Sequence, residues 1–300
     1  MQTTESATNT SHVPLLILGA GWTSTFLVPL LEREHIAWAA TTTDGRDGTI
    51  AFKYDPSSSD LTQFKALPYA QTVLIVFPLT GHGPAAHLVH LYEASHSSEA
   101  HGPKPRFIQL GVTSIWTAPH WQDEDAPYDA TNPRAVAEDE LMASADAAVL
   151  SLAGLYGGSR KPRTWLGRVV RTKADLKGKG ALHVIHGEDV ARAVVALHRD
   201  FTPGKRWLLC DLHVYDWWDL AQDWAVQALK TAEGGGDGGG GEVDEAEASR
   251  QRELLAWVGE LMIEEGVRAL PRDTKLLGRV LDGRGFWKRM GIWPSQGRLT

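Results

Sequence analysis

Residues 15–31, LLILGAGWTSTFLVPLL, contain the pattern that predicts the fold of this chain. An apolar run typical of a buried strand leads into GAGWTS at residues 19–24, and apolar residues at helical spacing follow. Gly19 permits a sharp turn, Gly21 allows a pyrophosphate to approach the main chain, and the first N–H groups of the helix then face that anion. The predicted dinucleotide contacts of this segment are Gly19, Gly21, Trp22, Thr23 and Ser24.

The glycine pattern is degenerate at its last position. Ser24 stands where the fingerprint prefers glycine or alanine, whose small size lets the helix pack closely on the strand. The alternative interpretation is a plain tight turn without a ligand. The strand before the turn, the helix after it and its position near the start of the chain favour dinucleotide binding.

The composition is that of a globular protein. The chain has 300 residues, of which 43% are hydrophobic, enough for a sizeable core in one large or two small domains. The net charge is −7 and the basic residues are dispersed, which disfavours nucleic acid as a partner. The single cysteine, Cys210, lies in an apolar run, which predicts a small core residue, excludes an intrachain disulfide and indicates a reducing compartment.

No segment of the sequence indicates a membrane or a secretion signal. Residues 1–12 are polar and predict a disordered tail. No apolar run approaches the roughly 18 to 20 residues that cross a bilayer. We therefore expect a soluble, cytoplasmic protein with a small-molecule substrate.

Short β-rich runs recur at helix-sized intervals along the first half of the chain. This alternation predicts an α/β fold with a doubly wound parallel sheet, a Rossmann fold. The predicted strands are residues 15–18, 37–42, 49–54, 72–77, 106–110 and 147–152. The predicted crossover helices are residues 25–33, 84–95 and 135–145.

The pattern changes after about residue 200. We predict a dinucleotide-binding domain at residues 13–200 and a small, mainly helical substrate region at residues 201–300. Helical periodicity returns at residues 217–230 and 248–265. The glycine-rich segment between them cannot bury enough apolar surface to order itself, so residues 233–247 are predicted to be a flexible insertion.

The loop after the second predicted strand bears on the choice of cofactor. Asp44 stands where an acid binds a free ribose 2′-hydroxyl, which favours NAD. Thr42, Thr43 and Arg46 instead offer hydroxyl donors and a fixed positive charge that suit a 2′-phosphate. NADP is the favoured prediction and NAD the alternative, while an Asp-Gly turn with a solvated arginine would bind neither.

Two further positions are predicted cofactor contacts. Asp55 follows the third strand, where a carboxylate could accept a hydrogen bond from the adenine amino group. Pro78 follows the fourth strand, at the sheet edge where the cofactor would lie. His82, His87 and His90 lie close in sequence, but no carboxylate or thiol completes a ligand set, so no metal site is predicted.

The fifth predicted strand leads into two hydroxyl side chains, Thr113 and Ser114. A hydroxyl at this edge of the sheet would orient a carbonyl substrate beside the nicotinamide. The alternative is ordinary capping of the strand end by Ser or Thr. Both residues are therefore candidate catalytic groups.

Four segments together resemble the extended and atypical short-chain dehydrogenase/reductase superfamily, in particular its epimerase/dehydratase-like members. The resemblance covers about residues 13–200. It implies an NAD(P)-binding Rossmann domain, a small C-terminal substrate region and a catalytic set of a hydroxyl, a tyrosine and a lysine. The segments are GAGWTS at 19–24, GVTSIWTA at 111–118, LAGLYG at 152–157 and IHGEDVARA at 185–193.

This sequence departs from the catalytic set that the resemblance implies. The serine falls at Val112, which leaves Thr113 as the nearest hydroxyl, and Tyr-x-x-x-Lys falls on Arg134 and Glu138. Tyr128 could replace the missing acid. Without a lysine ammonium, however, its phenol, with an ordinary pKa of about 10, lacks the usual source of pKa depression.

Residues near the predicted substrate region have two interpretations each. In one interpretation His186 and Asp189 line the rim of the substrate pocket, and in the other, which we favour, Glu188 or Asp189 interacts with the N-terminus of a helix. Six tryptophans either line an aromatic pocket or, for the most part, pack in the core. They are Trp217, Trp218, Trp224, Trp257, Trp287 and Trp293.

Three functional hypotheses follow. The first is an oxidoreductase or epimerase-like enzyme that transfers a hydride on a small carbonyl or hydroxylated substrate, with Thr113, Ser114 and Tyr128 as candidate catalytic residues. The second is a non-catalytic NAD(P)-binding sensor or scaffold, motivated by Arg134 and Glu138 at the positions of the tyrosine and the lysine. The third is a structural protein that binds no dinucleotide.

Overall fold

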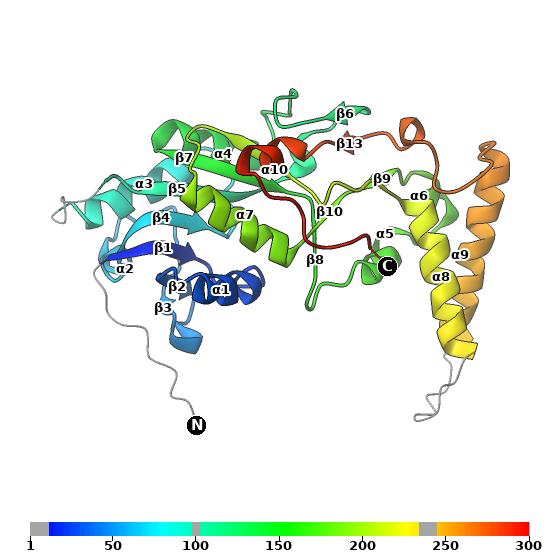
Figure 1. Ribbon diagram of the computed structural model, residues 1–300, viewed down its shortest axis with the longest axis horizontal. Helices are drawn as coiled ribbons and strands as arrows, with labels where there is room; N and C mark the ends of the chain where they lie inside the picture. Colours follow the sequence, from blue (N-terminus) through cyan, green and yellow to red (C-terminus); the bar gives the residue numbers. More distant parts are fainter. Residues whose placement is uncertain (1–11, 98–102, 234–244, 300) are drawn as a thin grey trace.

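The computed structural model describes residues 12–97, 103–233 and 245–299. Its centre is a seven-stranded sheet in the order β11-β7-β5-β4-β1-β2-β3 (Figure 1). Every neighbouring pair in this sheet is parallel, which confirms the predicted doubly wound α/β fold. Its strands are β1 (His12–Leu18), β2 (Trp38–Thr42), β3 (Ile50–Ala51), β4 (Tyr69–Ile75), β5 (Arg106–Val112), β7 (Ala147–Leu152) and β11 (Arg206–Leu209).

Helices cover both faces of the sheet because its strands are apolar on both sides. Along β1, Leu15 and Ile17 belong to one buried cluster, whereas Leu16 and Leu18 belong to the other. The first cluster is covered by α1 (Ser24–Arg33), α7 (Gly187–Arg199) and α10 (Arg284–Met290). The second is covered by α2 (Thr62–Lys65), α3 (Pro84–Ser95) and α4 (Pro133–Ser144).

The observed boundaries differ most from the predicted ones at β3. Only two of the six predicted residues, Ile50 and Ala51, pair with β2. Beyond them, the Lys53 N–H donates to Gln63 Oε1 at 2.7 Å and not to β2. β4 is shifted, starting three residues before and ending two residues before its prediction. β7 and α3 have the predicted bounds. β1 already begins at His12, and residues 1–11, most of the predicted tail, lie outside the described residues.

The chain after residue 200 first returns to the sheet as β11, a strand that the sequence did not predict. Cys210 directly follows it and is fully buried, as expected, and burial raises the pKa of its thiol to about 12. Three short strand pairs connect the sheet to the rest of the chain. They are β8 (Gly154–Tyr156) with β10 (Val184–His186), β9 (Ala181–Leu182) with β12 (Tyr215–Asp216), and β6 (Trp121–Gln122) with β13 (Val280–Leu281).

A helical region with its own core lies to one side of the sheet (Figure 1). Its longest helices, α8 (Trp217–Glu233) and α9 (Glu245–Glu264), pack side by side against α5 (Arg163–Val169) and α6 (Lys173–Lys177). The buried Trp218 indole donates to Leu176 O at 2.8 Å. The glycine tract at 234–244 lies outside the described residues.

Most of the six tryptophans pack in a core, as expected. Trp217, Trp218, Trp224 and Trp287 are buried, whereas Trp293 is 56% exposed. Among the described residues, no helix combines the length and apolar character needed to cross a lipid bilayer.

Candidate functional site

The turn between β1 and α1 adopts the backbone shape that the glycine pattern predicts. Gly19 has a φ of 93°, a region that side chains with a Cβ rarely adopt. Its N–H donates to Thr41 Oγ1 at 2.9 Å, and the Ala20 N–H donates to Thr41 O at 2.6 Å. A Cβ on Gly19 would lie 3.2 Å from Phe77 Cδ1. The turn is thus held between β2 and the end of β4.

The outer side of this turn is open and carries polar donors. A Cβ on Gly21 would meet no atom within 4 Å. Within the described chain, the backbone N–H groups of Gly21, Trp22 and Thr23 donate no hydrogen bond, although α1 starts directly after them. Ser24, at the degenerate position, is buried without displacing the helix. The segment therefore has the space and the donors that an anionic group requires.

The side chain of Trp22 joins the turn to a loop from the other half of the molecule. Its indole Nε1 donates to Gly157 O at 3.1 Å. The Arg160 guanidinium carbon lies 4.3 Å from the centre of the indole ring, within the range of a cation–π interaction. The glycine turn therefore borders the segment that follows β8.

The groups that bear on cofactor choice meet at the end of β2. Thr42 Oγ1 donates to Asp44 Oδ1 at 3.1 Å, and Arg46 Nη1 donates to the same oxygen at 3.0 Å. The hydroxyl of Thr42 and the charge of Arg46 lower the pKa of the Asp44 carboxyl. Asp44 and Arg46 are 60% and 55% exposed, and Thr43 is also exposed. The acid and the arginine are therefore paired with each other and both accessible.

The predicted adenine contacts lie in different surroundings. Asp55 is exposed and accepts hydrogen bonds from the Ser57 N–H at 2.9 Å and the Ser57 hydroxyl at 2.7 Å, so it stabilises its own loop. Pro78 is exposed directly after Phe77, whose ring stacks on Tyr54 at 6.1 Å between centroids. Pro78 thus follows the residue that packs against the glycine turn, whereas the Asp55 carboxylate already has partners.

The hydroxyl residues after β5 are placed by a single-turn helix, η2 (Thr113–Ile115). Thr113 is 7% exposed and Ser114 is exposed. Neither hydroxyl forms a hydrogen bond with another described residue. Arg279 Nη1 donates to Thr113 O at 3.0 Å and holds the backbone here. Both hydroxyls therefore remain available for an external partner.

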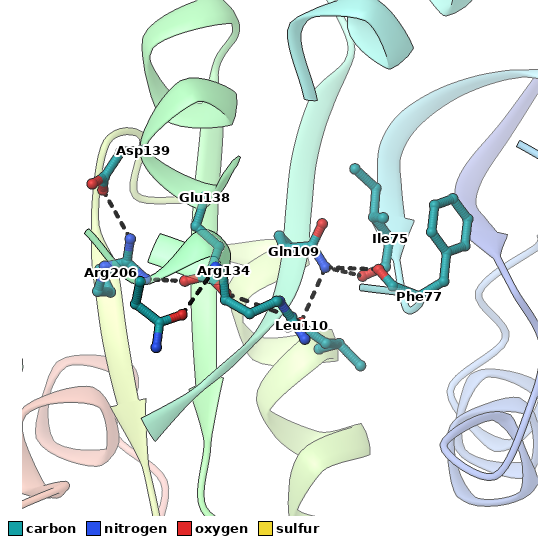
Figure 2. Close-up of polar contacts among 9 residues, drawn as sticks. Ile75, Phe77, Gln109, Leu110, Arg134, Glu138, Asp139 and Arg206 are labelled. Atoms are coloured by element: carbon teal, nitrogen blue, oxygen red, sulfur yellow. Dashed lines mark hydrogen bonds and ion pairs between the residues drawn. The ribbon is translucent and has the colours of Figure 1, made fainter. Parts of the chain in front are cut away.

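The two residues at the tyrosine and lysine positions belong to an internal ion-pair network (Figure 2). Arg134 Nη2 donates to Leu110 O at 2.9 Å and lies 3.5 Å from Glu138 Oε1. Glu138 Oε2 accepts a hydrogen bond from Arg206, the first residue of β11. The side chains of Glu138 and Arg206 are 1% and 5% exposed. Burial raises the pKa of Glu138, against the opposing effect of Arg206.

Tyr128, the candidate acid, is attached to the same network. Its hydroxyl donates to Asp139 Oδ1 at 2.8 Å, and Arg206 Nη2 donates to that oxygen at the same distance. The Arg206 guanidinium carbon lies 4.8 Å from the centre of the Tyr128 ring. Burial and the hydrogen bond to Asp139 raise the pKa of Tyr128. The phenol is thus committed to a carboxylate, and its catalytic role stays a prediction.

A pocket of about 500 Å³ lies beyond Trp22, between the segment after β8 and the C-terminal segment. His186 lines it and also accepts a hydrogen bond from the Glu188 N–H at 3.2 Å as the N-cap of α7. Its place at the rim of a substrate pocket stays a prediction. The sequence predicted none of the cationic side chains of this pocket as site residues. They are Arg160, Lys161, Arg163 and Arg298.

The histidines near α3 take up other contacts. His87 Nε2 lies 2.9 Å from Ser58 O. Within the described ranges, no group of three or more His, Cys, Asp or Glu side chains is arranged to hold a metal ion.

No protein-family model and no curated protein matches this sequence. Solved structures do match over nearly the whole chain. A functionally unknown conserved protein from Silicibacter pomeroyi is 17% identical, with a TM-score of 0.59 and coverage of 96% of this chain and 95% of that one. MoeE5 in complex with UDP-glucose and NAD is 16% identical, with a TM-score of 0.54 and coverage of 95% and 94%.

A third match is the human epimerase family protein SDR39U1 with NADPH, 12% identical, with a TM-score of 0.53 and coverage of 95% of this chain and 96% of that chain. At these sequence identities the comparison shows the fold alone. The chain has the Rossmann fold of epimerase and short-chain dehydrogenase/reductase structures, which confirms at the level of the fold the resemblance inferred from its sequence.

Proposed function

We propose that this protein binds a nicotinamide dinucleotide at the carboxyl edge of its parallel sheet and transfers a hydride on a small carbonyl or hydroxylated substrate. The observation that carries the proposal is the open glycine turn. Within the described chain, its N–H groups at residues 21–23 donate no hydrogen bond, they directly precede α1, and the space beside Gly21 is free. Such a helix start binds pyrophosphate through main-chain donors and the helix dipole.

The residues around the turn fit the rest of such a cofactor. Arg46 and Thr43 offer a charge and a hydroxyl toward a ribose 2′-phosphate, so NADP is favoured, and Asp44 keeps NAD as the alternative. The hydroxyl of Thr42, which is buried, instead bonds to Asp44 and Thr49. Structures of the same fold contain NADPH in one case and NAD in another, which supports the class of cofactor and not the choice. When bound, the nicotinamide would supply or accept the hydride.

The chain's own contribution to the chemistry would come from the hydroxyls after β5. Thr113 and Ser114 have no hydrogen-bond partner among the described residues, so they can donate to the oxygen of a substrate. Tyr128 is the third candidate, although its hydroxyl would first have to leave Asp139. The pocket next to Trp22 would hold the remainder of the substrate.

Calorimetric titration with NADPH and NADH tests the cofactor, and the absorbance of reduced nicotinamide with a panel of carbonyl compounds tests the reaction. We expect Thr113→Val to lower turnover by at least about tenfold with unchanged NADPH affinity, since positioned proton donors typically contribute 10²–10⁴-fold. Tyr128→Phe is the parallel variant. If the NADPH-loaded protein oxidises no cofactor with any carbonyl, and neither variant changes anything, the catalytic proposal is wrong.

A second candidate is a non-catalytic dinucleotide sensor or scaffold. It is favoured by the buried Glu138–Arg206 pair, which occupies the place where the fold's catalytic lysine would act. Affinity capture with the apo protein and with the NADPH-loaded protein tests this candidate. Identical partner sets in the two states would contradict it, and the absence of any NADPH or NADH binding would contradict both candidates.

A further inference from the structure

The wall of the pocket beyond Trp22 is strongly cationic. Arg160, Lys161, Arg163 and Arg298 line it, and none of the lining residues that the structure describes carries a carboxylate. This concentration of positive charge stands in a chain whose net charge is −7. Like charges gathered around a cavity repel one another unless an anion is bound between them.

None of these four cations forms an ion pair with any other described residue. Arg160 stacks on Trp22, the guanidinium carbon of Arg298 lies 5.6 Å from the centre of the Tyr215 ring, and Arg163 donates to the amide of Gln227. All four side chains are exposed, unlike the buried Arg272, which is paired with Asp216 at 2.6 Å. The pocket charges are therefore accessible to a ligand, although Arg298 also acts to lower the pKa of Asp219 against the larger effect of burial.

The C-terminal segment brings Arg298 to this pocket from α10, which packs on the sheet. Figure 1 shows this segment running from α10 past the start of α7 to the neighbourhood of α5. The N–H and the hydroxyl of Ser295 both donate to Asp189 Oδ1 at 2.8 Å, and Arg192 Nη1 donates to Trp293 O at 2.7 Å. The Leu299 N–H donates to Tyr215 Oη at 3.0 Å. Contacts on both sides of Arg298 thus fix the segment.

The pocket also borders the glycine turn. Gly157, whose carbonyl accepts from Trp22, lines the pocket and has a φ of 107°. A Cβ at this position would lie 2.2 Å from His186 Nε2, so only glycine lets the loop pack against the start of α7. A ligand in this pocket would therefore lie next to a dinucleotide bound at the turn.

We propose that this pocket binds an anionic substrate through its phosphate or carboxylate groups, and that the C-terminal segment completes the site by supplying Arg298. This inference rests on the proposed function in naming the ligand a substrate. Arg160, Lys161 and Arg298 would donate charge-assisted hydrogen bonds to the anionic oxygens. Tyr156 and Trp224 provide apolar surface for the uncharged part, and a cavity of about 500 Å³ has the size of a small-molecule site.

Calorimetric titrations at constant ionic strength test the proposal, with inorganic pyrophosphate, inorganic phosphate and malonate as probes. Each probe is titrated into the apo protein and into protein saturated with NADPH. We expect pyrophosphate or malonate to bind both forms, and Arg298→Gln and Arg160→Gln each to raise the Kd at least about tenfold, since hydrogen bonds between charged groups contribute ~1.5–3 kcal/mol. The stronger probe decides between phosphate and carboxylate.

Arg284→Gln is the matched control, because Arg284 is exposed and paired with Asp282 outside the pocket. It should leave the anion Kd unchanged, and both Arg298→Gln and Arg284→Gln should keep the wild-type NADPH affinity within about twofold. The proposal is overturned if no probe binds, if Arg298→Gln and Arg160→Gln behave like the control, or if NADPH displaces the anion. Anion binding without NADPH binding would leave this site standing and refute the dinucleotide proposal.

Discussion

The β1–α1 turn and the start of α4 use their polar groups in opposite ways. At the turn, the N–H groups of residues 21–23 have no acceptor in the described chain. At the start of α4, Arg134 and Glu138 are taken up by Leu110 O and by Arg206. The first region leaves its donors without a partner, as the proposed cofactor site requires, whereas the second uses its charges to hold a helix against an edge strand.

Within this fold, the residues suited to bind a cofactor therefore differ in character from those at the positions for proton transfer. The Rossmann turn keeps the geometry that binds a pyrophosphate. The α4 positions that the resemblance assigns to a tyrosine and a lysine carry an arginine and a glutamate, whose charges stabilise each other in the interior. A reaction at this site would therefore need a proton donor other than a tyrosine–lysine pair on α4, and the hydroxyls after β5 and Tyr128 are the proposed candidates.

Removing Arg206 should produce the largest effect. Arg206→Leu leaves the carboxylate of Glu138, 1% exposed, without its main partner. Breaking one side of a buried pair typically costs ~3–5 kcal/mol, and we expect a loss of this order in the free energy of unfolding. Urea denaturation followed by circular dichroism measures it.

The pH dependence of that loss identifies Glu138 as its source. Burial already raises the pKa of Glu138 in the folded state, and removing Arg206 raises it further. The folded variant then binds a proton more tightly than the unfolded chain, whose glutamate pKa is about 4.3, so its stability falls as the pH rises above that value. The deficit against wild type should be largest at neutral pH and shrink toward pH ~4. The double variant Glu138→Leu/Arg206→Leu should recover much of the loss, and equal deficits at both pH values would rule out this explanation.

The second prediction concerns the turn. Gly19→Ala places a Cβ 3.2 Å from Phe77 Cδ1 at a φ of 93°. A positive φ costs a non-glycine residue ~1–2 kcal/mol, and the displaced turn should lower NADPH affinity at least about tenfold. Titration calorimetry and thermal unfolding measure the two effects.

Gly204→Ala is the matched control for this prediction. Gly204 also has a positive φ, 68°, but its Cβ would meet no atom within 4 Å. It should lose a similar amount of stability and keep its NADPH affinity. A parallel loss of affinity in both variants would mean that general destabilisation, and not the shape of the turn, sets the binding.

The parts of the fold that the sequence predicted are those with local causes. β7 has its predicted bounds because all its residues are buried, so five of its six residues are apolar and only Ser151 is polar. The turn at Gly19 could be predicted from its local glycine pattern, although Thr41 and Phe77 from other segments hold it in place. β11 begins with Arg206, whose burial requires Glu138 from another part of the chain, so its short sequence did not indicate a strand.

For the candidate site too, the sequence predicted only the parts that have local causes. The glycine turn and the hydroxyls Thr113 and Ser114 each directly follow one strand. Their positions at the sheet edge could therefore be predicted from the order of elements along the chain. The cationic pocket combines Arg160 with Arg298 from the C-terminal segment, and this segment is placed by the buried carboxylate of Asp189. The basic residues at 160–163 are visible in the sequence, but their partner across the pocket could come only from the structure.

The third prediction asks whether the C-terminal segment depends on its contact with Asp189. Ser295→Ala removes the hydroxyl that donates to Asp189 Oδ1 at 2.8 Å. We expect a loss of ~1–2 kcal/mol in unfolding free energy, because the fully buried acceptor loses one of its donors. Pyrophosphate affinity should fall as Arg298 becomes less fixed. Ser144→Ala, which removes an exposed hydroxyl bonded to Glu140 O, is the control and should change neither quantity. Unchanged affinity in Ser295→Ala would show that the segment is held without this contact.

The smallest expected effect is at the end of β2, where Asp44 and Arg46 are paired and exposed. Arg46→Gln removes the charge that favours a 2′-phosphate, so the ratio of NADPH affinity to NADH affinity should fall about fivefold, the size of a solvent-screened interaction of ~1 kcal/mol. Asp44→Asn removes the acid that favours a free 2′-hydroxyl and should raise that ratio. Because both side chains are exposed, neither change should alter the free energy of unfolding appreciably. Competitive titration of the two reduced nucleotides measures the ratio. If Arg46→Gln lowered both affinities equally, the arginine would contact the pyrophosphate or stabilise its own loop, and it would not select the ribose 2′-group.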